Sequence, residues 1–135
     1  MKKIKGIVAV IIFAVIALCP LLPALAEQSD PIVLFAGARA TGPGEAQTPP
    51  DDYVYYTVQV NIVGSPTAVT VAVEGNIIGT IYSEMANHTF TAGELTAGQA
   101  IFSIAHMPTG KIRGNVIVFA GGTNAQLAMI VKGVK

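Results

Sequence analysis

YVYYTVQVNIVGSPTAVTVAVEG, the stretch from Tyr53 to Gly75, decides the fold class of this chain. Apolar and hydrogen-bonding residues alternate along Tyr53–Val63, which is typical of a β-strand with one solvated face. Gly64-Ser65-Pro66-Thr67 has turn chemistry, and Ala68–Gly75 alternates again. The two runs therefore predict an antiparallel hairpin. We expect its buried side to consist of Val54, Val58, Val60, Ile62, Val69, Val71 and Val73.

The rest of the chain is divided into similar short apolar runs. We expect further strands at Ile32–Gly37, Asn76–Met85, His88–Thr91, Gln99–His106, Lys111–Phe119 and Ala125–Lys132. Ala86-Asn87 is a predicted break, Ala92–Gly98 a predicted loop and Ala120–Asn124 a predicted hairpin loop. About eight strands with turns every ten residues or so predict an all-β, antiparallel β-sandwich of jelly-roll type. In the last two strands we expect these side chains to point inward: Ile112, Val116, Val118, Leu127, Met129 and Val131.

The first 26 residues have the features of a secretory signal peptide. Lys2, Lys3 and Lys5 precede an uncharged apolar run, and Ala24-Leu25-Ala26 offers a small-x-small cleavage site. We therefore expect cleavage before Glu27, which would also remove Cys19. The remaining chain is predicted to be one domain, with residues 27–52 as an N-terminal strand and loop and residues 53–135 as the sandwich body. The predicted location is outside the cell or at its surface, with the periplasm as a further possibility.

Charge limits the partners of the predicted mature chain. Five basic residues remain against eight acidic ones, a formal net charge of −3. Nucleic-acid binding needs a basic surface, so we expect no nucleic-acid partner. We also expect no membrane partner after signal cleavage.

The first predicted strand is separated from the body by a long loop. Ala38–Asp52 is rich in glycine and proline and has no periodicity. Such a loop could let Ile32–Gly37 leave its own sheet and pair with the sheet edge of a neighbouring copy. The run is apolar on both faces, which predicts burial or an interface. The strand-exchange candidates are Ile32, Val33, Leu34 and Phe35.

No residue pattern predicts catalysis or a cofactor. Ser65, Ser83 and Ser103 stand in no nucleophile motif. Glu74 and Glu84 flank one predicted turn, as a glycosidase pair could, but solvated turn acids are favoured. A metal site would need His88 and His106 to converge with Glu84 or Glu94, or Asp51 and Asp52 to recruit backbone oxygens. We expect no enzyme activity, no metal site and no cofactor, with a small hydrolase as a remote alternative.

The outward side of the central strand is the main candidate for a binding surface. Tyrosines beside hydrogen-bonding side chains suit a protein interface, and they also suit sugar rings. A plain solvated or covered face is the remaining alternative. The candidate residues are Tyr53, Tyr55, Thr57, Gln59 and Asn61, joined by Arg113 and Asn115 from the strand Lys111–Phe119.

Two segments carry a resemblance to a known module. Val69–Tyr82 (VTVAVEGNIIGTIY) and Lys111–Gly133 (KIRGNVIVFAGGTNAQLAMIVKG) together resemble a β-sandwich module of phage virion proteins and bacterial secreted proteins. In outline this module is similar to discoidin-like, galactose-binding-like jelly rolls. Asn76-Ile77-Ile78-Gly79 and Tyr82 stand where that module usually has aspartate and tryptophan. The resemblance implies an accessory role, such as glycan binding, surface attachment or assembly.

These observations favour an exported, non-catalytic protein that acts by self-association or surface attachment. The expected partners are other copies of the chain, a glycan or another cell-surface ligand. A carbohydrate-binding module is the alternative.

Overall fold

The computed structural model describes residues 28–49, 53, 55–105 and 110–135. In these parts the chain forms eight β-strands and one short helix, α2 (Ala92–Ala97). The strands are β1 (Ile32–Ala38), β2 (Gly42–Pro43), β3 (Tyr55–Val63), β4 (Ala68–Asn76), β5 (Ser83–Thr89), β6 (Gln99–Ala105), β7 (Lys111–Ala120) and β8 (Gln126–Val134). The predicted signal peptide, Asp51, Asp52, Val54 and His106 lie outside the described residues.

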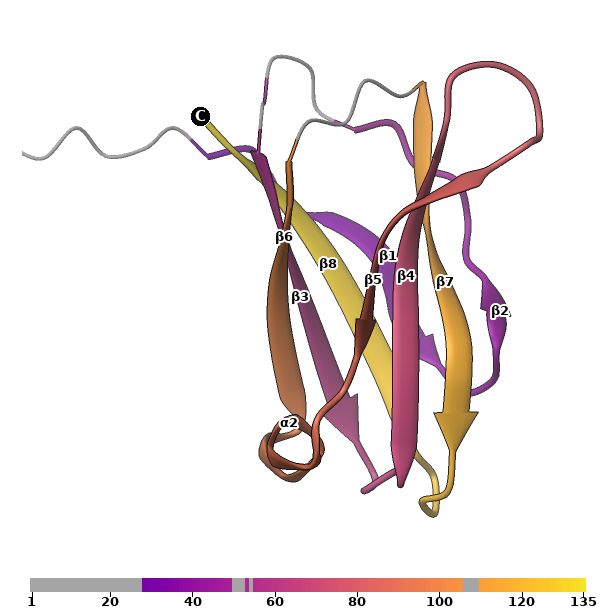
Figure 1. Ribbon diagram of the computed structural model, residues 1–135, viewed down its shortest axis with the longest axis vertical. Helices are drawn as coiled ribbons and strands as arrows, with labels where there is room; N and C mark the ends of the chain where they lie inside the picture. Colours follow the sequence, from indigo (N-terminus) through magenta and orange to yellow (C-terminus); the bar gives the residue numbers. More distant parts are fainter. Residues whose placement is uncertain (1–27, 50–52, 54, 106–109) are drawn as a thin grey trace, which may run out of the picture.

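The strands form two four-stranded antiparallel sheets that face each other (Figure 1). Sheet A has the order β1-β8-β3-β6 and sheet B the order β2-β7-β4-β5. The neighbours β1–β8, β2–β7, β3–β6 and β4–β5 are the pairs made when a chain of eight strands is folded back on itself at its middle. Wrapping this long hairpin around a core gives a jelly roll, so the predicted all-β, jelly-roll-like sandwich is confirmed.

The predicted hairpin between β3 and β4 is wrong. β3 pairs with β6 and β8 in sheet A, whereas β4 pairs with β5 and β7 in sheet B. Gly64–Thr67 therefore crosses from one sheet to the other. Ala120–Asn124 was predicted as a hairpin loop and likewise joins β7 of sheet B to β8 of sheet A. Alternation marks the buried side of each strand, but facing strands of two sheets show the same alternation as a hairpin.

The core lies between the sheets and contains most of the side chains that alternation placed there. Val58, Val60, Ile62, Val69, Val71 and Val73 are buried, as are Ile112, Val116, Leu127, Met129 and Val131. The prediction for Val118 is wrong. Thr70 pairs with Val118 but Val71 pairs with Val116, so Ile117 is an extra residue in β7. This bulge reverses the alternation beyond it, which exposes Val118 and turns Phe119 toward the core.

β1 forms the edge of sheet A and pairs with β8 of its own chain. The strand was predicted to be buried or at an interface: Leu34 is buried, whereas Val33 is exposed within the chain, so an interface on that face stays a prediction. The Phe35 ring packs against two glycines, Gly44 just after β2 and Gly114 on β7, where added Cβ atoms would lie 2.9 and 2.6 Å from the ring. Exchange of β1 between copies stays a prediction.

The segment from Asn76 to Gly98 differs most from expectation. β4 extends to Asn76, residues 77–82 form a loop, and β5 continues across the predicted break at Ala86-Asn87. The predicted loop Ala92–Gly98 contains α2. Its first turn is closed by a capping box, in which the Thr91 hydroxyl accepts from the Glu94 backbone N–H and the Glu94 carboxylate accepts from the Thr91 backbone N–H. The Thr-x-x-Glu spacing is the sequence signal that predicts this helix start.

In the described part of the chain, no helix has the length and apolarity needed to span a membrane.

Candidate functional site

Three rows of side chains on the outward side of sheet A are aligned by the strand register. The first row is Val33, Ile130, Gln59 and Ile101; the second is Lys132, Thr57 and Ser103; the third is Val134, Tyr55 and Ala105. We call this set the sheet A face. Lys132 is its one charged member. Tyr55, Thr57 and Gln59 of the predicted row therefore lie in the middle of a wider surface that has one charged side chain.

Large apolar groups on the sheet A face are open to solvent. Tyr55 is 58% exposed and Ile101 is 61% exposed, and Val33 at the opposite edge is also exposed. Between them a shallow hollow of about 360 Å³ is lined by Gln28, Pro31, Thr57, Gln59, Ile130 and Lys132 among others. Exposed apolar side chains next to amide and hydroxyl groups can bury area and still satisfy hydrogen bonds.

Tyr53 and Asn61, the ends of the predicted row, are already engaged. The Tyr53 ring lies over Gly133, where an added Cβ would be 2.6 Å from the ring, and the Lys135 ammonium lies 5.2 Å from the ring centroid. The Asn61 side-chain oxygen accepts a hydrogen bond of 3.1 Å from the Gln59 amide. The available part of the row is therefore centred on Tyr55 and Thr57, with Gln59, which donates to Asn61, at its end.

Arg113 and Asn115 are not part of the sheet A face. They lie on β7 in the other sheet, where both donate to Glu74 of β4: Arg113 Nε to Oε2 at 2.7 Å and Asn115 Nδ2 to Oε1 at 2.7 Å. The Arg113 guanidinium also stacks on the Tyr82 ring at 3.9 Å from its centroid. This group ties β4 and β7 to the loop that ends at Tyr82.

The carboxylate pair considered from the sequence is adjacent in space. Glu74 and Glu84 are register partners on β4 and β5. Both oxygens of Glu74 accept hydrogen bonds from β7, and its side chain is 14% exposed. Glu84 is exposed and accepts from the Asn87 amide at 2.7 Å. The geometry gives Glu74 a role in joining strands.

His88 lies where the edge strands β5 and β6 close the side of the sandwich. Its ring stacks on Phe102 at 5.2 Å, and its Nε2 is 3.0 Å from Glu94 Oε1. The pKa of Glu94 is lowered, chiefly because its carboxylate accepts the Thr91 backbone N–H, with His88 adding to the effect. In the described parts, histidine, cysteine, aspartate and glutamate side chains form no group of three that could hold a metal ion.

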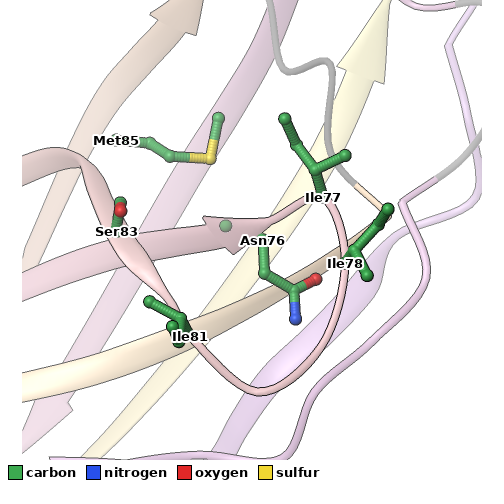
Figure 2. A pocket seen from close by; sticks show the side chains of 7 residues that line it. Asn76, Ile77, Ile78, Ile81, Ser83 and Met85 are labelled. Carbon is green, nitrogen blue, oxygen red and sulfur yellow. The ribbon is translucent and has the colours of Figure 1, made fainter.

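A second exposed apolar surface was not predicted. Residues 77–82 form a loop that protrudes at the end of the sandwich opposite α2 (Figure 1), and Ile77, Ile78 and Ile81 are exposed on it. We call this segment the isoleucine loop. Beside it lies a hollow of about 520 Å³, which Asn76, Ser83 and Met85 also line (Figure 2). Apolar residues at positions 77, 78 and 81 cannot share one face of a strand, and this spacing is the signal that could have revealed the loop.

Comparisons with known proteins show the fold. No family model matches the sequence, and no curated protein matches it. Among solved structures, the chain is similar to SPBc2 prophage-derived protein YomS, with a TM-score of 0.57 and 11% identity over 82% of this chain and 96% of that one. It is also similar to PBSX exported protein XepA, with a TM-score of 0.56 and 13% identity over 82% of this chain and 38% of that one. The chain thus shares its all-β fold with these two proteins.

Proposed function

We propose that this protein is an exported, non-catalytic module that assembles with other copies of itself through the sheet A face. The observation that carries the proposal is the aligned register of the three rows, with one lysine among the side chains that they present. The centres of protein interfaces are depleted of charge and enriched in aromatic residues such as Tyr55. An apolar edge residue such as Val33 extends the same surface.

The comparisons support the proposed export. XepA is named as an exported protein, and YomS as prophage-derived. Both have this fold, and a chain that begins with the features of a signal peptide fits the same setting. Similarity to discoidin-like jelly rolls in particular remains part of the proposal, as does attachment to a cell surface.

Placing a charge on the sheet A face is expected to prevent assembly. Ile101→Glu puts a carboxylate within the proposed contact, where it would lose water without gaining a partner. Size-exclusion chromatography with light scattering should show an oligomer for the unaltered protein and at least tenfold weaker association for the variant. The matched control is Ile117→Glu, because Ile117 is an exposed isoleucine on sheet B. A monomer at every concentration would contradict the proposal.

Glycan binding is the second candidate, favoured by the hollow on the same face. Thr57, Gln59 and Lys132 offer hydrogen-bonding groups there, and Tyr55 supplies an exposed ring in the adjoining row. We expect glycan-array hits to be lost in Tyr55→Ala and kept in Tyr82→Ala, whose ring packs under Arg113 on the other sheet. An empty array, or equal losses in the two variants, would exclude this candidate.

A further inference from the structure

The isoleucine loop presents more exposed apolar surface than its contacts explain. Ile77 is 75% exposed, Ile78 is 87% exposed and Ile81 is 83% exposed. From Gly75 to Ser83 the chain has no charged residue. Single exposed apolar residues are ordinary, but three on one protruding loop form a patch of the kind that marks an interaction site.

The loop is held at its base rather than collapsed onto the sandwich. Asn76 is buried, and its side-chain amide donates to the Gly79 carbonyl at 2.7 Å. The Gly110 N–H donates to the Asn76 carbonyl at 2.6 Å. At the other end, Tyr82 is fixed beneath the Arg113 guanidinium. The loop is therefore held in place while its isoleucines remain exposed to water. A binding partner that covers them would explain this arrangement.

The shape of the loop favours a fluid partner over a flat protein face. Figure 2 shows Ile77 and Ile78 on one limb and Ile81 on the other, with their side chains pointing to different sides. Side chains that point in different directions are covered less completely by one flat surface than by mobile acyl chains. A lipid layer can close around them, as it does around the apolar residues of interfacial anchors.

The residues behind the tip are those found at the level of lipid headgroups. Tyr82 is partly exposed at the base of the loop, and tyrosine is enriched at membrane–water interfaces. Lys111 is the register partner of Asn76 and is exposed, with its amine 3.1 Å from Thr48 Oγ1. An apolar tip with tyrosine and lysine behind it matches the depth profile of a bilayer surface.

We propose that the isoleucine loop inserts into the outer part of a lipid bilayer and holds the protein at a membrane surface. This site is separate from the sheet A face. It differs from the expectation of no membrane partner, because insertion of a loop tip needs no spanning segment. Ile77, Ile78 and Ile81 would enter the acyl region, and Lys111 would favour anionic headgroups.

Flotation with lipid vesicles tests the proposal. The purified protein should float with vesicles of phosphatidylcholine and phosphatidylglycerol, and Ile78→Ser/Ile81→Ser should weaken binding on the order of a hundredfold, about tenfold for each side chain withdrawn from the bilayer. Ile101→Ser is the matched control, since it removes an exposed isoleucine from the sheet A face. Lys111→Gln should weaken binding only when phosphatidylglycerol is present.

Three results would overturn the assignment. The unaltered protein could fail to float with vesicles of either composition, with or without phosphatidylglycerol. The double variant could bind as well as the unaltered protein, or Ile101→Ser could lose as much binding as the double variant. Light scattering without vesicles tests the other possible occupant, which is a second copy of the chain. If the unaltered protein is an oligomer, the double variant is a monomer and neither binds vesicles, the loop contacts that second copy. Because all the substituted side chains are exposed, unchanged thermal unfolding confirms that each variant is folded.

Discussion

Leu127→Ala is expected to lower the free energy of unfolding by about 3 to 4 kcal/mol. Leu127 is fully buried on β8, the strand that lies between β1 and β3 in sheet A. Its side chain packs in the core with those of both sheets, so truncation leaves a cavity that neighbouring strands cannot close without breaking their register. Urea denaturation followed by circular dichroism measures the loss. If the unfolding free energy depends on urea concentration with the same slope in both proteins, the variant unfolds between the same folded and unfolded states as the unaltered protein.

Ile101→Ala is the control for this experiment. It removes a side chain of similar size from β6, but Ile101 is exposed and points away from the core. The loss should stay within about 0.5 kcal/mol when the protein is dilute enough to be monomeric. If Leu127→Ala cost as little as Ile101→Ala, β8 would present its other side to the core.

Alternation determined which side of each strand is buried, and this part of the fold could be predicted. Val58, Val71 and Met129 follow from period-two patterns, because burial depends on the side chain's own polarity and that of its neighbours. Pairing does not follow in the same way. β3 and β4 are consecutive and complementary, yet they lie in different sheets because the jelly roll changes sheet at every connection except that between β4 and β5.

Part of the candidate site could be predicted as well, because that part lies on a single strand. Tyr55, Thr57 and Gln59 share one strand, so their common face follows from alternation alone. Arg113 and Asn115 were grouped with them although β7 belongs to sheet B, and their partner Glu74 is far away in the sequence. Ile101 and Ile130, which complete the sheet A face, could be found only once the pairing of β3 with β6 and β8 was known.

The sheet crossing between β3 and β4 has a direct test in Gly64. Its φ is +87°, and an added Cβ would lie 2.6 Å from the Cα of Ala125, just before β8. Thr67 anchors the same crossing by donating its backbone N–H to the Ala120 carbonyl at 2.8 Å. The two crossings, residues 64–67 and 121–125, therefore pack backbone against backbone at one end of the sandwich.

Gly64→Ala is expected to lower the free energy of unfolding by about 3 kcal/mol. About 1 to 2 kcal/mol come from a side chain in left-handed backbone, and a similar amount from displacing the Ala125 backbone. Gly79→Ala separates the two, because Gly79 has φ +82° with no atom within 4 Å of an added Cβ, so about 1 kcal/mol is expected. Thermal and urea unfolding of both variants measure the difference. In a plain hairpin Gly64 would have no second crossing against it, so equal losses at the two glycines would contradict the packed crossing and, with it, the placement of β3 and β4 in opposite sheets.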